Sequence, residues 1–157
     1  DEGIIERVSH GLYMDSKLFK DEYYIIQKKY PSAIFSYNTA LYFYGMTDRT
    51  PIHFDMTFPS NNRVKNDDIK VHYIKKENHK LGLIKLKLED GCEVQVYNIE
   101  RTICDIVRSR SRMADETFIT SIKNYAASPN KNLANLSLYA SKMKILSQLR
   151  QYLEVLL

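Results

Sequence analysis

The chain has 157 residues, and its 44% hydrophobic content is enough to fill one folded core, which excludes a wholly disordered protein. Its 23 basic and 19 acidic side chains give a net charge of +4, which is weak evidence for a polyanionic partner and falls short of a nucleic-acid signature. The two cysteines, Cys92 and Cys104, exclude a disulfide framework, and their spacing suggests no zinc site.

Apolar runs in the sequence stay well below the roughly 18 residues needed to cross a bilayer, and no charged leader precedes an apolar segment. We therefore expect a cytoplasmic protein with no membrane partner, no metal and no cofactor. The chain begins with Asp1 inside what reads as structure, so we expect it to be a piece of a longer protein.

The first 45 residues predict a hairpin followed by two helices. Two β-prone runs, 4–8 and 11–14, flank Ser9-His10 and indicate a hairpin. Apolar residues recur at helical spacing over 16–30, where Pro31 ends the helix. The second helix begins at Ser36 as N-cap and stops at Gly45 as its C′ residue. Its expected buried residues are Tyr37, Ala40, Leu41 and Tyr44.

The middle of the chain predicts strands, and the last third predicts helices. Residues 52–58 alternate apolar and polar side chains, as a strand with one buried face requires. Asp90-Gly91 indicates a hairpin with a type I′ turn, because that turn needs positive φ at both central residues. The other expected strands are 69–76, 83–89 and 92–97, and three helices start at Asn98, at Ala114 and near Asn132, the last broken around Ser141. This order predicts an α+β fold in which a small mixed or antiparallel sheet packs with helices, preceded by a hairpin and followed by a helical C-terminal segment.

The segment 98–112, NIERTICDIVRSRSR, predicts a capped amphipathic helix. Asn98 is a good N-cap, and Glu100 in the first turn complements the helix dipole. The apolar stripe is Ile99, Ile103, Ile106 and Val107, and Cys104 needs only to be a small semi-buried residue. Asp105 lies four residues after Arg101 and three before Arg108, so it can pair within its own helix. The expected DNA or partner surface consists of Arg101, Arg108, Arg110 and Arg112.

Three enzyme classes were compared with the sequence. A nucleotidyltransferase needs Asp-x-Asp, but Asp55-Met56-Thr57 lacks the second carboxylate. A nuclease needs Asp followed by Glu-x-Lys, but the segment after Glu93 carries Gln95 in place of the lysine. A Cys-His hydrolase has no local support for Cys104 beside any of His10, His53, His72 and His79. We predict no catalytic residues, and the alternative is a nuclease-like or nucleotide-processing enzyme that uses Asp55 and Glu93.

Two longer segments resemble a known family. The first is 35–51, FSYNTALYFYGMTDRTP, followed by the strand through Asp55 and Thr57 to Pro59, and the second is 96–105, VYNIERTICD, with Arg108 after it. Together with the ending 152–156, these segments resemble the AbiEi family, the antitoxin and transcriptional-regulator components of type IV toxin–antitoxin pairs in abortive phage infection. The residues that carry this motif are Gly45, Asp48, Arg49, Asp55, Asn98, Glu100 and Asp105.

The resemblance implies a two-domain protein that represses its own operon and counteracts a nucleotidyltransferase toxin. An N-terminal winged helix-turn-helix would bind operator DNA, and a C-terminal domain would provide antitoxin action. On this interpretation 1–15 is the remnant of the wing, where Arg7 and His10 would touch phosphate, and 16–157 is the antitoxin domain. The recognition helix is missing from the chain, so operator binding requires the full-length protein. The resemblance also implies that the toxin is countered without a stable complex.

Overall fold

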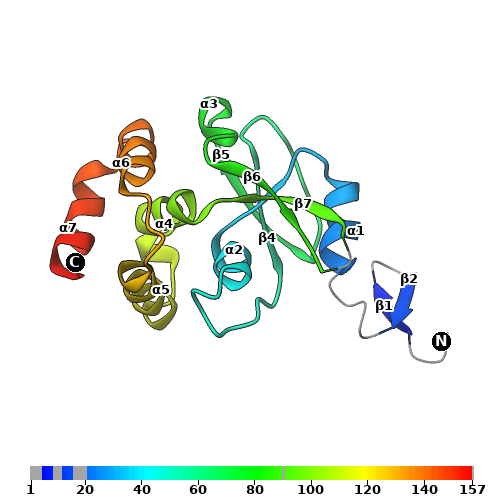
Figure 1. The fold of residues 1–157 in the computed structure, drawn as a ribbon. Coiled ribbons are helices and arrows are strands. Elements are labelled where there is room, and N and C mark those ends of the chain that lie inside the picture. Colours follow the sequence, from blue (N-terminus) through cyan, green and yellow to red (C-terminus); the bar gives the residue numbers. More distant parts are fainter. Residues whose placement is uncertain (1–4, 9–11, 16–20, 90, 157) are drawn as a thin grey trace.

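The structure is a computed structural model that describes residues 5–8, 12–15, 21–89 and 91–156, and it shows a mixed sheet between two unequal helical layers (Figure 1). The N-terminal half contains β1 (Ile5–Val8), β2 (Leu12–Asp15), α1 (Asp21–Lys29), β3 (Ile34–Phe35), α2 (Tyr37–Phe43), β4 (Phe54–Pro59) and β5 (Ile69–Ile74). The remainder contains α3 (Lys76–His79), β6 (Leu83–Lys87), β7 (Glu93–Tyr97), α4 (Ile99–Arg108), the 3₁₀ turn Arg110–Arg112, α5 (Asp115–Ala127), α6 (Leu133–Lys142) and α7 (Leu146–Leu156).

The main sheet has five strands in the order β5-β4-β3-β7-β6. The pairs β4–β5 and β3–β7 are parallel, whereas β3–β4 and β6–β7 are antiparallel, so the sheet is mixed. The predicted α+β class is confirmed. The predicted N-terminal hairpin is present as the antiparallel pair β1–β2, while its connection, 9–11, lies outside the described residues.

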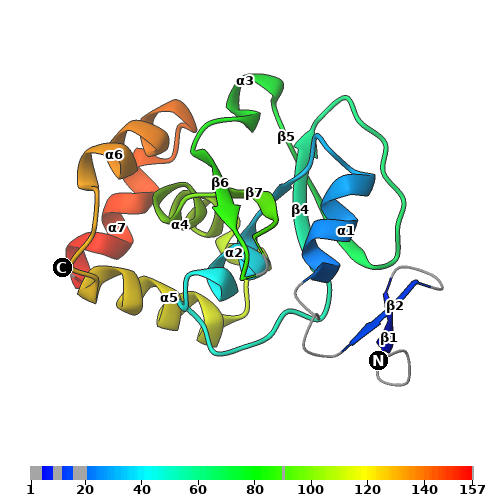
Figure 2. The ribbon, with the colours of Figure 1, turned by 45° about the vertical axis from the view of Figure 1, so that its right-hand side comes forward.

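Helices cover both faces of the sheet, and Figure 2 shows α1 on one side and α4 to α7 gathered on the other. The α1 face is apolar and includes the fully buried side chains of Phe35, Met56 and Val96. The remaining helices share a second apolar core, formed mainly by residues of α4, α5, α6 and α7. The second face of the sheet also carries buried polar side chains, among them Asp55 and Thr57.

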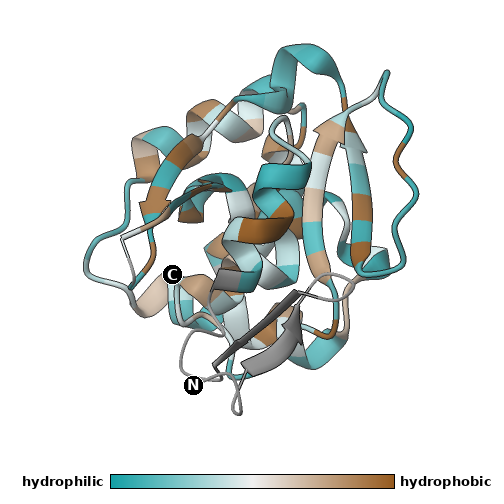
Figure 3. Cartoon of the chain, turned by 90° about the vertical axis from the view of Figure 1, so that its right-hand side faces the viewer, coloured by the Kyte–Doolittle hydropathy of each residue, from teal (hydrophilic) through white to brown (hydrophobic). Residues whose placement is uncertain are grey.

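The strand β4 differs from its prediction. The alternation is present and is visible as brown and teal bands along the strands in Figure 3, but both faces are buried. Asp55 and Thr57 are each 3% exposed, because helices cover the face that the sequence pattern assigns to solvent. The strand also begins at Phe54, and Ile52, predicted to lie within it, is 92% exposed in the preceding loop.

The turn between β6 and β7 is described in part. The predicted hairpin is confirmed, the Gly91 amide donates to Leu88 O, and Leu88 N donates to Cys92 O at 2.7 Å. Gly91 takes the left-handed conformation with φ of 93°. Asp90, the first central residue of the predicted type I′ turn, lies outside the described residues.

The helix boundaries follow local signals in several places. Gly45, with φ of 67°, ends α2, and Met46 N donates to Leu41 O across the helix end, as a Schellman motif requires. The predicted break in the C-terminal tail is confirmed between α6 and α7, where Lys144 has φ of 62°. α1 is described from Asp21, and the predicted start over 16–20 lies outside the described residues. None of the described helices combines the length and the apolar character that crossing a bilayer requires.

Gly82, directly before β6, lies against the start of α4. Its φ is 82°, its carbonyl accepts from Asn98 N at 2.8 Å, and an added Cβ would lie 2.6 Å from Arg101 Cβ. A side chain at this position would collide with the start of α4, which has no freedom to move aside.

We predict that Gly82→Ala lowers the free energy of unfolding by about 2–5 kcal/mol, from the left-handed backbone and the collision together. Gly45→Ala is the matched control, because Gly45 is also left-handed but has nothing within 4 Å of the added Cβ. It should cost only about 1–2 kcal/mol. Urea unfolding followed by circular dichroism measures both, and equal losses would show that the contact with Arg101 is unimportant.

Candidate functional site

The start of α4 is built from buried polar contacts. The predicted N-cap is confirmed, since the Asn98 side chain accepts from Arg101 N at 2.9 Å. Glu100 is 5% exposed, and its Oε2 accepts from Tyr125 OH and from Asn132 N, both at 3.0 Å. Burial and the neighbouring Glu100 carboxylate raise the pKa of Tyr125. Glu100 therefore joins α4 to α5 and to the N-cap of α6, a larger role than the dipole contact predicted for it.

Arg101 corrects the predicted arginine surface, because its side chain is fully buried. Nε donates to Asp105 Oδ1 at 3.1 Å, and Nη1 donates to the carbonyl oxygens of Asn78 and Leu81 at 2.7 and 2.6 Å. The guanidinium carbon lies 3.9 Å from the centre of the Tyr97 ring. Burial opposes the charge, but the adjacent Asp105 carboxylate outweighs it, so the pKa of Arg101 is raised and the residue stays charged. The predicted Arg101–Asp105 pair is confirmed.

The other three arginines do not share one face. Arg108 is exposed at the end of α4, where the helix stops. Arg110 lies 4.3 Å from the centre of the Phe118 ring and donates to Asp115 Oδ1 at 2.8 Å. Arg112 donates to Ser109 Oγ at 2.8 Å. The prediction placed these arginines on one face by assuming that the α-helix continues through Arg112. The helix ends at Arg108, and Arg110 and Arg112 lie in a 3₁₀ turn where that spacing no longer applies.

Arg108 instead belongs to a groove of about 430 Å³ between β5, the ends of α4 and α6, and the link to α7. Four exposed basic side chains line it, together with one acidic residue, Glu77, and the aromatic ring of Tyr73, which is 41% exposed. We call this site the basic groove, and its basic residues are Lys75, Arg108, Lys142 and Lys144. Four cations against one acid create a local field that favours an anionic partner.

Three of these four cations were not predicted from the sequence. Lys75 and the Lys142–Lys144 segment are far apart in the chain, and nothing local to either one marks a binding surface. The tertiary fold brings them beside Arg108. The two remaining predicted contact residues cannot be placed, because the side chain of Arg7 and the whole of His10 lie outside the described residues.

Asp55 lies in a buried polar network on the second face of the sheet. Its Oδ1 is 3.0 Å from His72 Nε2, and its Oδ2 accepts from Thr39 Oγ1 at 3.4 Å. Its backbone amide donates to Thr39 Oγ1 at 2.9 Å. The His72 ring in turn stacks on Tyr37, with centroids 4.0 Å apart. The network fixes β4, β5 and α2 relative to one another.

Asp55 and Glu93 are not brought together, so a site that uses both carboxylates is wrong for this fold. Met56 and Val96 both flank Phe35, which fixes the register between β4 and β7. In that register Asp55 and Glu93 lie two strands apart, at about 4.8 Å per strand, and about 13 Å apart along the strand direction. They also line different cavities. Groups of three or more potential metal-ligating His, Cys, Asp or Glu side chains are absent among the residues that the structure describes.

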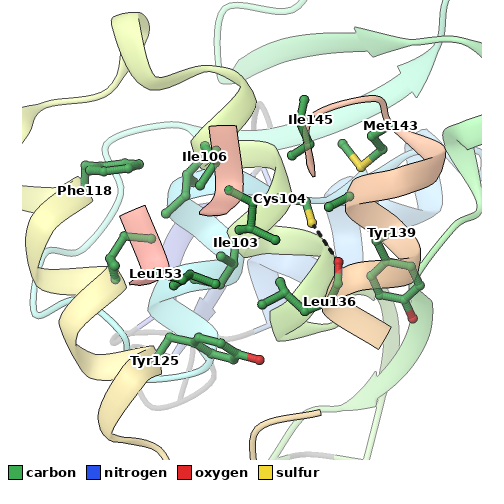
Figure 4. Close-up of a cluster of buried hydrophobic side chains, with 14 of the residues drawn as sticks. Ile103, Cys104, Ile106, Phe118, Tyr125, Leu136, Tyr139, Met143, Ile145 and Leu153 are labelled. Carbon is green, nitrogen blue, oxygen red and sulfur yellow. Dashed lines mark hydrogen bonds between the residues drawn. The ribbon is translucent and has the colours of Figure 1, made fainter. Parts of the chain in front are cut away.

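Cys104 is a core residue. Its Sγ contacts Leu136 O at 3.7 Å within the helical core, as Figure 4 shows. Burial, with Asp105 nearby, raises the pKa of its thiol to about 12. His72 is engaged with Asp55, and His79 Nε2 lies 3.3 Å from Thr57 O in a setting where burial lowers its pKa. Cys104 was predicted to be semi-buried, and the structure buries it completely.

The remaining motif residues have structural positions. Gly45 closes α2, Arg49 pairs with Glu116 of α5 across exposed side chains, and Asp48 is exposed in the loop between α2 and β4. Exposed pairs of this kind contribute about 1 kcal/mol or less. The motif as a whole therefore holds helices and loops in place.

Comparisons with known proteins bear on the fold. No protein-family model matches the chain, and no curated protein matches it significantly. The crystal structure of the Rv2827c protein from Mycobacterium tuberculosis is similar, with a TM-score of 0.67 at 9% sequence identity. The similarity covers 96% of this chain and 60% of that one, so the chain spans about three fifths of the length of that protein. At this identity the likeness establishes a shared fold.

We predict that breaking the buried ion pair from one side is costly. Arg101→Met leaves Asp105 unpaired in the core and should lower the free energy of unfolding by about 3–5 kcal/mol. Arg101→Met with Asp105→Leu should cost less than the sum of the two single changes, by about 1–3 kcal/mol. The exposed pair Arg49–Glu116, changed to Met and Gln, is the control and should show a coupling of about 1 kcal/mol or less. Equal coupling energies for the two pairs would contradict a special role for the buried one.

We also predict that Cys104 resists thiol reagents in the native state. With a pKa of about 12, only about one thiol in 10⁴ is ionised at pH 8, and the sulfur is fully buried. In a Cys92→Ser background, a chromogenic disulfide reagent at pH 8 should label Cys104 only as fast as the protein opens, and at once in denaturing urea. Rapid labelling of the native protein would instead indicate an accessible, activated thiol.

Proposed function

We propose that this chain is the C-terminal part of an antitoxin and transcriptional autorepressor from a type IV toxin–antitoxin system of abortive phage infection. In this proposal residues 1–15 are the end of a winged helix-turn-helix, and 16–157 form the antitoxin domain. The full-length protein binds operator DNA in the cytoplasm. It also counteracts a nucleotidyltransferase toxin without requiring a stable complex with it.

The basic groove is the observation that carries this proposal. Lys75, Arg108, Lys142 and Lys144 come from separate parts of the chain, yet all four are exposed around one hollow. Contacts between basic side chains and phosphate groups provide most of the sequence-independent affinity of DNA-binding proteins. A repressor that reads bases through its N-terminal domain gains affinity and orientation from such a second surface.

The sequence resemblance is a second, independent observation that supports the same proposal. The residues that carry it are concentrated in α2, the loop after it, β4 and the start of α4, and these elements pack together through buried residues such as Leu41 and Ile103. They act as scaffold, while the charged groove lies at its surface. A scaffold that presents charge fits a regulator better than an enzyme built on Asp55 and Glu93, which lie far apart in the sheet.

We predict that reversing the charge of the groove weakens regulation by the full-length protein. Lys75→Glu, Arg108→Glu, Lys142→Glu and Lys144→Glu together should lower operator affinity at least about tenfold in moderate salt. They should also reduce the slope of log K against log salt by roughly 0.9 for each lost phosphate contact. Toxin protection and reporter repression in cells give the matching functional measurement. Arg101 is left unchanged, because a glutamate there would disrupt the core.

The control variant reverses four exposed cations outside the groove, Lys65, Lys85, Lys123 and Arg150, and so changes the net charge equally. It should keep most of the affinity and most of the protection. If the two variants behave alike, only net charge matters and the groove has no specific role. If the groove variant retains both repression and protection, the proposed function loses its structural support.

A further inference from the structure

A second cavity, separate from the basic groove, opens beside the loop between α2 and β4. It has a volume of about 350 Å³, within the range of small-molecule sites. Residues from α2, from the loop 45–53, from β4 and β5, and from the turn before α5 all line it. Figure 2 shows how this loop runs from the end of α2 below α5 to β4. We call it the loop cavity.

Three cations, one carboxylate and one side-chain amide are among the groups that line the loop cavity. Arg49, Lys70 and Arg112 provide the positive charge, and all three are exposed. Arg49 shares its charge with Glu116, whereas Arg112 is oriented by its hydrogen bond to Ser109 Oγ at 2.8 Å. Asp55 is the one carboxylate in the lining. The cations outnumber it, so the cavity favours a ligand with net negative charge.

The acceptors have capacity for a ligand. Both carboxylate oxygens of Asp55 already have one partner each, His72 and Thr39, but an ionised carboxylate has about four acceptor positions. The amide oxygen of Asn38 is buried and has no hydrogen-bond partner among the described residues. Buried acceptors of this kind are normally paired, so a donor on a bound molecule would complete the site.

The backbone beside Asn38 is strained. Tyr37 is buried and has φ of 49°, in the left-handed region that a bulky side chain rarely enters. Its hydroxyl lies 2.9 Å from Ser109 Oγ, and its ring stacks on His72, so its surroundings hold it there. Backbone strain that is held in place by surrounding contacts is concentrated at functional sites. Ser109 contacts both Tyr37 and Arg112, and so couples the acceptor wall of the cavity to one of its cations.

We propose that the loop cavity binds the phosphate monoester of a small molecule that carries hydroxyl or amine donors. Lys70 and Arg112 hold the phosphate, since ammonium and guanidinium groups both bind phosphate oxygens. Asp55 and Asn38 accept hydrogen bonds from the body of the ligand. Two sources share this chemistry, ribonucleoside monophosphates and sugar phosphates. Neither requires the basic groove, so the inference is independent of the proposed function.

Isothermal titration calorimetry on the full chain tests the proposal, with the four ribonucleoside monophosphates, glucose 6-phosphate and inorganic phosphate as probes. We expect at least one monoester to bind with one-to-one stoichiometry and at least tenfold more tightly than inorganic phosphate. The probe that binds shows whether the ligand is a ribonucleoside monophosphate or a sugar phosphate. The proposal is overturned if every monoester binds no more tightly than inorganic phosphate does.

Two variants assign the binding to this cavity. Lys70→Met with Arg112→Met should weaken monoester binding at least tenfold, whereas Lys75→Met with Lys144→Met removes the same charge from the basic groove and should change it less than twofold. Asn38→Ala should reduce the preference for the monoester over inorganic phosphate, because it removes an acceptor for the body of the ligand. Thermal melting confirms that each variant is folded. Equal effects of the two double variants would place the ligand elsewhere and overturn the proposal.

Discussion

A charged arginine in the middle of the molecule is the constraint on which the rest of the structure depends. Arg101 joins its own helix through Asp105, α3 and the segment after it through the carbonyl oxygens of Asn78 and Leu81, and β7 through the ring of Tyr97. Each of these contacts satisfies part of a charge that would otherwise be costly to bury. These contacts hold α4 in place against the sheet, and Gly82 leaves the space that the start of α4 occupies.

The second face of the sheet carries buried polar side chains among its apolar ones. The α1 face packs apolar side chains, as an ordinary sheet does, but the opposite face carries Asp55, Thr57 and His72 beneath α2 and α4. Each of these three side chains has a hydrogen-bond partner, which lowers the cost of burying it. Directional hydrogen bonds replace non-directional apolar packing, and they set the orientation of α2, which in turn supplies Tyr37 and Asn38.

Local signals in the sequence were sufficient for much of the fold. Asn98 as N-cap and Gly45 as helix end act within one turn of chain, and both were predictable from residue type and spacing. Arg101 was assigned to a surface because an amphipathic helix ordinarily turns its charges to water. α4 has no such face over most of its length, since α2, α5, α6, α7 and the sheet enclose it. A local sequence pattern cannot show that a helix face will be buried by helices that come later in the chain.

The candidate sites were less predictable, because each is assembled from distant segments. Lys75 lines the basic groove with Lys142 and Lys144 because α6 packs against α4, and Lys70 and Arg112 line the loop cavity although they are far apart in the chain. The residues that carry the family resemblance behave in the opposite way. Asn98, Glu100 and Asp105 hold buried contacts that position α4. These residues hold the fold together, whereas the basic side chains that line the basic groove and the loop cavity are exposed.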